Sequence, residues 1–285
     1  MNFHMNIKET RISVNGYTLH FRFIERDASL PWLFMFHGFL GSGEQFCPVA
    51  ESFSAHVNIC LPDLIGFGKS DVPADILQYT AAVQVNNWLE ILESGYFGHR
   101  VILHGYSMGG RLALRLAIRI NAYKNGILSE TVKGLILEST TPGLRDKSER
   151  LERAKMEALM VQEIRADLPG FLTKWKTNPL FKKGKSSALL EKIQSDTNPA
   201  GAAASLTSFG SGSVEPVWNE LENLNIPVLI LAGESDLRYR SIAIETEKQI
   251  KYSTLQIIEC AGHRIHSDNP EQYISAIIAW IQKIV

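Results

Sequence analysis

The chain has 285 residues, of which 45% are hydrophobic, and its 29 Lys and Arg nearly balance its 30 Asp and Glu, leaving a formal net charge of −1. This length suits one large α/β domain with an insertion better than two independent domains. The near-neutral charge supplies no basic field for nucleic acid, and no apolar run approaches the roughly 18 residues of a membrane span. We therefore expect neither nucleic acid nor a membrane as a partner, and no obligate protein partner is evident.

The amino terminus and the cysteines indicate the cellular compartment. Residues 1–8 lack a charged segment followed by an apolar core, so no signal peptide is expected. Cys47, Cys60 and Cys260 lack metal-ligand spacing and indicate reduced thiols rather than a disulfide framework. Cys260 lies three residues before His263 and could be near the site, but we expect it to serve packing. The sequence thus predicts a cytoplasmic protein that uses neither a metal nor an organic cofactor.

Strands alternate with helices through most of the chain. Asn15 and Gly16 separate two strand-like segments and predict the two-residue turn of a β-hairpin. Alternation of this kind implies an α/β fold with a mostly parallel, twisted sheet flanked by crossover helices. The expected strands after the hairpin are 32–36, 56–61, 101–103, 134–137, 227–232 and 255–258, and the expected helices include 46–53, 79–93 and 111–117.

The alternation stops between residues 142 and 220. Apolar periodicity there predicts only helices, at 148–165, 169–175, 187–195 and 200–209. We interpret this stretch as a helical cap over the carboxyl ends of the strands, where a site would otherwise face open water. The expected organisation is a core of residues 1–141 and 221–285 with a cap of residues 142–220 inserted in it.

The segment Gly105-Tyr106-Ser107-Met108-Gly109 carries the clearest chemical signal. It follows a predicted strand and precedes a predicted helix, which is the context of a nucleophile elbow. Glycine is expected at both ends because a Cβ there would collide with the strand or the helix. Ser107 is then presented at a helix N-terminus, whose dipole favours developing negative charge, and is the candidate nucleophile.

A serine nucleophile needs a base and an orienting acid, which in this arrangement follow it in the order acid, histidine. Asp236 follows one late predicted strand and is the candidate acid, and His263 follows the next strand and is the candidate base. Two other carboxylates remain open for the acid role. Glu234 lies in the same loop as Asp236, and Glu138 ends an earlier strand from which it could also reach the imidazole.

The glycine-rich loop 37–43 follows the predicted strand 32–36. Backbone N–H groups of such a loop, together with that of the residue after the nucleophile, form an oxyanion hole. We predict the N–H groups of Phe39 and Met108 as the two donors. His37 is expected to fix the loop by donating a hydrogen bond rather than to act in catalysis.

Several arginines are candidates for substrate binding. Arg111 lies one helical turn after Ser107, so its side chain is expected to point toward the mouth of the site. Arg150 and Arg153 are neighbours on the first predicted cap helix. Arg111 and one of these two could clamp a carboxylate-bearing substrate by bidentate hydrogen bonds. Solvated helix faces are the expected place of three other arginines: Arg115, Arg119 and Arg165.

A set of motifs spread over the chain resembles one enzyme family. The set comprises residues 37–43, 105–111, 138–144, 150–153, 175–181, 233–236 and 261–263. Together they resemble the α/β-hydrolase superfamily and, within it, the 2-succinyl-6-hydroxy-2,4-cyclohexadiene-1-carboxylate synthases of menaquinone biosynthesis. The elbow and triad are common to the superfamily, whereas the Gly-Gly-Arg, Pro-Gly-Leu and Trp-x-x-x-Pro-x-Phe stretches are more discriminating. The resemblance covers nearly the whole chain from residue 32 onward.

The resemblance implies an α/β-hydrolase fold with a helical cap and a reaction other than hydrolysis. In that family the triad removes a ring proton from 2-succinyl-5-enolpyruvyl-6-hydroxy-3-cyclohexene-1-carboxylate, and pyruvate is expelled. Ser107, activated by His263, would be the base, and the amides of Phe39 and Met108 would hold the enolate-like oxygen. The expected partner is thus a small polycarboxylate.

The family's substrate contacts fall on four positions of this chain, which are Tyr106, Arg111, Arg153 and Trp175. One departure concerns a further cap arginine of the family, which aligns with Gln194, with Lys192 nearby. Glutamine can donate a hydrogen bond to a carboxylate but cannot neutralise its charge.

Two other functions fit the same triad. A carboxylesterase or a C–C bond hydrolase would act through an acyl-enzyme and would have little use for Arg111 or Arg153. A receptor-like protein would keep the triad but bind its ligand without turnover.

Overall fold

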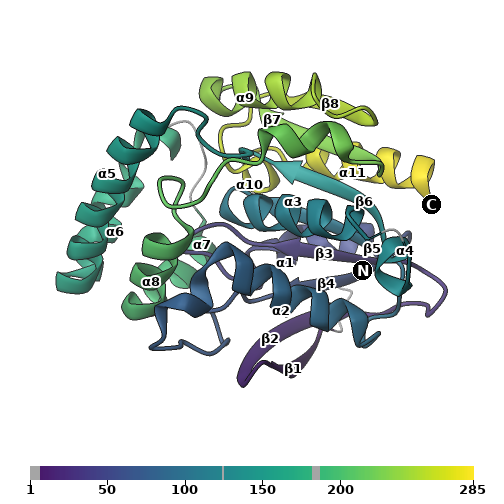
Figure 1. Ribbon diagram of the computed structural model, residues 1–285, viewed down its shortest axis with the longest axis horizontal. Helices are drawn as coiled ribbons and strands as arrows, with labels where there is room; N and C mark the ends of the chain where they lie inside the picture. Colours follow the sequence, from purple (N-terminus) through teal and green to yellow (C-terminus); the bar gives the residue numbers. More distant parts are fainter. Residues whose placement is uncertain (1–6, 124, 182–186) are drawn as a thin grey trace.

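The computed structural model describes residues 7–123, 125–181 and 187–285. Within these residues, eight strands form one sheet in the order β1-β2-β4-β3-β5-β6-β7-β8 (Figure 1). The hairpin β1–β2 and the pair β2–β4 are antiparallel, and all pairs from β4 to β8 are parallel. The strands are β1 (Lys8–Val14), β2 (Tyr17–Ile24), β3 (Trp32–Phe36), β4 (Asn58–Pro62), β5 (Val101–Tyr106), β6 (Val132–Glu138), β7 (Val228–Gly233) and β8 (Ser253–Ile258).

Helices cover both faces of this sheet (Figure 1). The α-helices are α1 (Cys47–Ala50), α2 (Ala81–Glu93), α3 (Met108–Asn121), α4 (Ile127–Thr131), α5 (Lys147–Ala166), α6 (Leu168–Lys176), α7 (Ala188–Ser195), α8 (Pro199–Phe209), α9 (Leu237–Glu247), α10 (Ile265–Asp268) and α11 (Pro270–Ile284). Short 3₁₀ helices are η1 (Gly43–Phe46), η2 (Glu51–Phe53), η3 (Ile76–Tyr79), η4 (Pro179–Phe181) and η5 (Trp218–Asn223).

Strand β3 shows why the sheet needs two layers of helices. Successive side chains of a strand point to opposite faces, and all five residues of β3 are buried. Phe34 belongs to the core formed with α2 and α3, where Trp88 and Leu112 pack. Met35 belongs to the opposite core, where Tyr273 of α11 packs. A strand buried on both faces has to be apolar throughout.

The expected elements of the core are found, with ends shifted by a few residues. Val14 pairs with Tyr17 across the predicted hairpin turn, and both Asn15 and Gly16 have positive φ, at +49° and +84°. Such values suit a turn that follows the twist of the strands. The expected helix 46–53 is divided among η1, α1 and η2. The α/β architecture with a mostly parallel sheet is therefore as predicted from the sequence.

The helices α5 to α8 lie between β6 and β7, within the stretch expected to form a cap. Each begins at a side chain that accepts a backbone N–H: Asp146, Asp167, Ser187 and Asn198, respectively. Such caps satisfy N–H groups that have no partner inside the helix. In Figure 1, α5, α6 and α8 lie on the side toward which the arrow of β6 points. Ile164 of α5 and Phe209 of α8 join the core shared with α3.

Two smaller expectations are wrong. Arg115 is not on a solvated face, because it is 9% exposed and donates a hydrogen bond to the carbonyl of Glu215. Burial lowers the pKa of this guanidinium to about 10. Cys260 does not serve packing, since it is exposed at a turn with φ +54°. Arg119 and Arg165 are exposed as expected.

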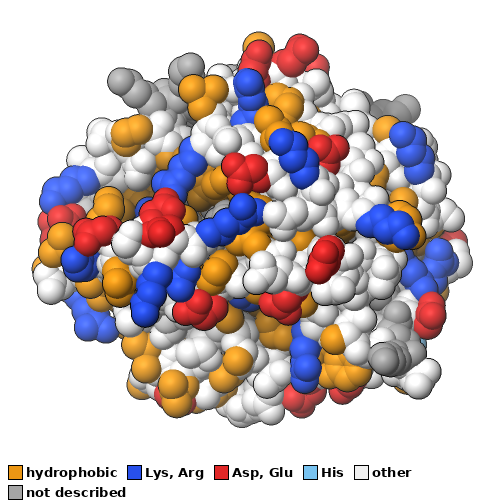
Figure 2. Space-filling model, turned by 45° about the horizontal axis from the view of Figure 1, so that its top comes forward, with side chains coloured by type: hydrophobic (Ala, Val, Ile, Leu, Met, Phe, Trp, Pro, Cys, Tyr) orange, Lys and Arg blue, Asp and Glu red, His pale blue; other side chains and the backbone are white. Residues whose placement is uncertain are grey.

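The surface carries both signs of charge. Figure 2 shows Lys and Arg interspersed with Asp and Glu on the face drawn, with apolar side chains between them. No helix within the described ranges is both long and apolar enough to cross a membrane. Residues 1–6, on which the expectation of no signal peptide partly rests, lie outside the described residues.

Candidate active site

Ser107 lies at the sharp turn between β5 and α3, with φ +52° and ψ −109°. A Cβ at Gly105 would come within 2.4 Å of the carbonyl oxygen of Gly109, and one at Gly109 would come within 2.3 Å of that of Phe36. No such approach is tolerated, so both positions require glycine. The strained turn predicted around the serine is present, and the two glycines make it possible.

Three residues distant in the chain meet in one hydrogen-bonded line. Nδ1 of His263 lies 2.6 Å from Oδ2 of Asp236, and its Nε2 lies 3.1 Å from Oγ of Ser107. Asp236 follows β7 and caps α9 by accepting the N–H of Tyr239 at 3.2 Å, which holds the carboxylate in place. The side chains of His263 and Asp236 are only 1% and 4% exposed. The spatial meeting expected for these residues is therefore observed.

The two other candidate acids bind elsewhere. Glu234 is exposed and accepts the N–H of Cys260 at 3.1 Å. Glu138 is fully buried and contacts the side chains of His104 and His266 rather than His263. The geometry thus favours Asp236 as the partner of the imidazole.

The loop 37–43 is held at its start by His37. Its Nδ1–H donates to the carbonyl of Gly38 at 2.8 Å, and its Nε2 accepts the N–H of Leu64 at 2.9 Å. Burial lowers the pKa of His37 to about 4, so the ring is neutral, as the second contact requires. The loop-fixing role expected for His37 is confirmed.

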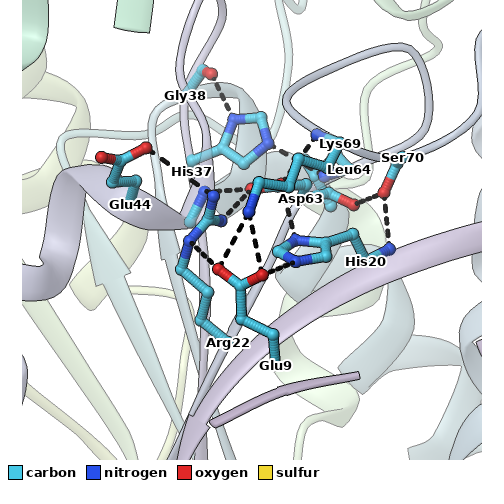
Figure 3. A network of polar contacts seen from close by, with 11 residues as sticks. Glu9, His20, Arg22, His37, Gly38, Glu44, Asp63, Leu64, Lys69 and Ser70 are labelled. Atoms are coloured by element: carbon cyan, nitrogen blue, oxygen red, sulfur yellow. Dashed lines mark hydrogen bonds and ion pairs between the residues drawn. The ribbon is translucent and has the colours of Figure 1, made fainter. Parts of the chain in front are cut away.

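The far end of the same loop is held by Asp63, which follows β4. Its buried carboxylate accepts the backbone N–H of Gly43 and Lys69, and contacts Nη1 of Arg22 and Nδ1 of His20, all at 2.8–2.9 Å (Figure 3). Burial alone would raise the pKa of Asp63, but the hydrogen bond with His20 and the charge of Arg22 outweigh it and lower the pKa to about 2. The sequence did not lead us to predict this role of Asp63 in holding the loop. The sequence indicates it only by placing an Asp directly after a predicted strand.

One pocket collects the predicted site residues. Eight of the nine line it, and the ninth, Asp236, lies behind His263. The eight are Phe39, Tyr106, Ser107, Met108, Arg111, Arg153, Trp175 and His263. The pocket thus brings the elbow, the loop 37–43 and helices of the insertion together around the Ser107 hydroxyl. The donor role of the N–H groups of Phe39 and Met108 stays a prediction.

The two candidate clamp arginines reach this pocket from two different helices. Arg111 of α3 is 6% exposed and donates from Nη2 to the carbonyl of Phe209 at 2.8 Å. Its buried Nε has no partner in the described part of the chain. Burial lowers the pKa of this guanidinium. Arg153 of α5 is 30% exposed and pairs with Glu157 at 2.7 Å. Arg150, the alternative on α5, binds the carbonyls of residues 144 and 145 and does not line the pocket.

Gln194, the position at which this chain departs from the family, lies outside the pocket around Ser107. Gln194 of α7 is 4% exposed and lines a separate groove between α6 and α7. Lys192 is exposed and pairs with Asp196 at 2.7 Å. In this structure, then, neither side chain contributes to the pocket around Ser107.

Aromatic rings line much of the remaining wall. Trp175 packs on Phe39 and Phe181 at ring distances of 5.7 and 5.4 Å. Tyr239 lies against the imidazole of His263 at 4.4 Å and was missed from sequence, although it follows the candidate acid closely. No group of three metal-ligating side chains occurs in the described part of the chain.

Comparisons with known proteins agree with this geometry. The alpha/beta hydrolase fold family matches residues 31–188. A 2-succinyl-6-hydroxy-2,4-cyclohexadiene-1-carboxylate synthase of Klebsiella pneumoniae is 31% identical over 258 residues, covering 90% of this chain and 94% of the relative. The structure of MenH from S. aureus superimposes with a TM-score of 0.83 at 27% identity, covering 92% of this chain and 98% of that chain. An esterase from Exiguobacterium antarcticum shares the fold, with a TM-score of 0.78 at 20% identity and coverage of 96% and 99%.

Fold, elbow and family match define the class, an α/β-hydrolase-fold enzyme. The esterase shows that this class includes different reactions. The chain belongs, within that class, to the 2-succinyl-6-hydroxy-2,4-cyclohexadiene-1-carboxylate synthase family.

Proposed function

We propose that this enzyme eliminates pyruvate from 2-succinyl-5-enolpyruvyl-6-hydroxy-3-cyclohexene-1-carboxylate, with Ser107, His263 and Asp236 as the catalytic residues. The observation that carries the proposal is the buried guanidinium of Arg111, whose Nε has no partner among the residues that the structure describes, in the same pocket as the Ser107–His263 hydrogen bond. A buried cation that keeps an unsatisfied donor is costly unless a ligand supplies an anion as the acceptor. A substrate with three carboxylates supplies it.

The substrate and product names define the bonds that change. The hydrogen on ring carbon 2 is acidified by the neighbouring succinyl ketone. Its removal by Ser107, which passes the proton to His263, leaves an enolate. When the ketone re-forms, the double bonds shift to carbons 2–3 and 4–5, and the bond from carbon 5 to the enolpyruvyl oxygen breaks. The leaving enolate of pyruvate takes up one proton, so that no water and no acyl-enzyme is needed.

Each protein group has a role that follows from its contacts. Asp236 orients His263 and stabilises the imidazolium that forms. In this proposal the N–H groups of Phe39 and Met108 stabilise the enolate oxygen, a contribution of roughly 3 kcal/mol for each donor. Arg111 and Arg153 bind carboxylates, while Tyr106 and Trp175 pack against the ring. The free thiols of Cys47, Cys60 and Cys260 are compatible with the reducing cytoplasm, where we place the enzyme.

The proposal is tested by comparing two substrates. Pyruvate released from the enolpyruvyl cyclohexene is measured with lactate dehydrogenase, and ester cleavage with p-nitrophenyl acetate. We expect rapid pyruvate release and slow ester cleavage, with Arg111→Ala lowering only the first. Fast turnover of the neutral ester that Arg111→Ala leaves unchanged would instead support a carboxylesterase. Tight binding of the polycarboxylate without turnover would indicate a receptor.

A further inference from the structure

A second carboxylate–imidazole pair lies close to the triad and has no part in the mechanism above. Oε1 of Glu138 lies 2.7 Å from Nδ1 of His266 and also accepts the backbone N–H of His266 at 3.2 Å. The two side chains are 0% and 3% exposed. We call Glu138 and His266 the buried pair.

The buried pair is bonded both to the backbone of Ser107 and to the segment that carries His263. The backbone carbonyl of Glu138 accepts the N–H of Ser107 at 2.9 Å, and its carboxylate holds His266, which lies on α10 just after His263. The turn that contains both histidines is closed by a hydrogen bond from the N–H of Gly262 to Oδ2 of Asp268 at 2.8 Å. One residue at the end of β6 therefore anchors both the nucleophile and the loop that carries its base.

The surroundings of Glu138 favour its ionised form. Burial alone would raise the pKa of this carboxyl, but the charge of His266 and the hydrogen bonds from His104 and His266 hold it well below its usual range. Nε2 of His104 lies 3.0 Å from the other oxygen of Glu138 and 3.0 Å from the hydroxyl of Tyr273. Burial lowers the pKa of His104. The carboxylate is thus held from two sides, which leaves little freedom to move.

The buried pair also contacts the loop expected to form the oxyanion hole. Nε2 of His266 lies 3.4 Å from Nε2 of Gln45, which is in η1, directly after that loop. The ring of Tyr106 packs near both imidazoles, with ring distances of 5.4 Å to His263 and 4.9 Å to His266. Elbow, histidine loop and oxyanion loop therefore share one set of buried contacts.

We propose that Glu138 and His266 are positioning residues that hold the imidazole of His263 against the Ser107 hydroxyl. They touch neither the pocket nor the substrate, and act only by orienting the loop that carries the base. Orientation matters because displacement of a reacting group by about 1 Å can cost roughly 10²-fold in rate. Only the kinetic part of the test rests on the proposed function.

The kinetic test compares two equally buried substitutions in the same cluster. His266→Phe keeps a ring but removes both nitrogens, whereas Tyr273→Phe removes a hydroxyl that bonds with His104 and Glu138 and leaves the bond between Glu138 and His266 in place. We expect His266→Phe to lower kcat for pyruvate release by about 10- to 100-fold with KM within about twofold. Tyr273→Phe should lower the melting temperature but leave kcat within about twofold. His266→Asn, which can place an N–H where Nδ1 stood, should restore most of the loss.

Two results of this comparison between His266→Phe and Tyr273→Phe would overturn the proposal. One is a folded His266→Phe variant with the kcat of the parent. The other is a loss of kcat that follows the loss of melting temperature equally in both variants, which would indicate a structural role alone. Glu138→Gln keeps the volume of the side chain and covers the case in which His266→Phe does not fold. Its kcat should fall with KM retained, and an unchanged kcat would also overturn the proposal.

A measurement without substrate separates this proposal from the proposed function. The Nδ1 proton of His263, bonded to Asp236 at 2.6 Å, is expected at low field in the proton NMR spectrum and is assigned by its loss in His263→Gln. We expect the signal to shift or broaden in His266→Phe but not in Tyr273→Phe. An unchanged signal in His266→Phe would overturn the positioning role. A changed signal in an enzyme that releases no pyruvate would overturn only the proposed function.

Discussion

Two carboxylate–imidazole pairs with almost the same bond length occupy different places in this molecule. Asp236 and His263 are 2.6 Å apart, and Glu138 and His266 are 2.7 Å apart. The first pair ends at Ser107 in the pocket, whereas the second is enclosed by His104, Gln45 and Tyr106. Bond geometry alone therefore does not mark a catalytic pair. What distinguishes the first is that the second nitrogen of its imidazole meets a hydroxyl that a substrate can reach.

The largest expected effect is on turnover, when the negative charge of Asp236 or of its neighbour Glu234 is removed. Asp236→Asn should lower pyruvate release by about 10³- to 10⁴-fold, because the imidazole loses the group that fixes its tautomer and stabilises its cation. Glu234→Gln, in the same loop, is the matched control and should have little effect. Near-normal rates in Asp236→Asn would transfer the acid role to Glu138 or Glu234.

The free energy of unfolding should depend more on the Glu138–His266 pair than on the Asp236–His263 pair, which is the reverse of their expected effects on turnover. Glu138→Ala leaves buried imidazoles without their anion and should lower the free energy of unfolding by about 3–5 kcal/mol. Asp236→Ala removes a helix cap and one hydrogen bond of a single imidazole, that of His263, and should cost less, about 2 kcal/mol. Urea denaturation of both variants measures the difference. Equal costs would show that the second pair is no more structural than the first.

The pH dependence of stability tests a third imidazole, the neutral one that fixes the loop 37–43. The pKa of His37 is lowered from 6.5 to about 4 by burial, so between these values the unfolded chain binds a proton that the folded chain does not. Stability from this group is complete above pH 6.5 and should fall by roughly 3 kcal/mol as the pH drops to 4. His37→Gln should remove this part of the slope in urea unfolding followed from pH 7 to 4. An identical slope in parent and variant would contradict the assignment.

The smallest expected effect concerns substrate binding in the pocket where the Asp236–His263 pair meets Ser107. Arg153→Ala should raise KM for the polycarboxylate about tenfold, equivalent to about 1.4 kcal/mol, and change kcat less. Arg165→Ala removes an exposed arginine from the same helix and serves as the control. If KM is unchanged in Arg153→Ala, the arginine clamp is wrong.

The triad was predictable from sequence because each member follows a strand. Carboxyl ends of parallel strands meet at one edge of a sheet, so order along the chain is enough to bring Ser107, Asp236 and His263 together. The buried pair was not predictable in this way. Glu138 also ends a strand, and only packing against α10 decides which histidine it meets.

Local sequence patterns also failed to predict which helix face is buried and which side chain anchors a loop. The burial of Arg115 depends on a segment distant in the chain, where the carbonyl of Glu215 accepts a hydrogen bond from its guanidinium. The anchoring role of Asp63 depends on the distant side chains of His20 and Arg22. Local patterns identify elements and their ends, whereas contacts between distant elements require the folded structure.

The most direct test of the catalytic claim is pyruvate release by Ser107→Ala in the presence of saturating enolpyruvyl cyclohexene substrate, with the melting temperature measured alongside. We expect a folded variant whose rate is lower by about 10⁴-fold, because the base that receives the ring proton is gone. A folded Ser107→Ala variant that releases pyruvate within about tenfold of the parent rate would contradict the role of Ser107 and, with it, the proposed mechanism.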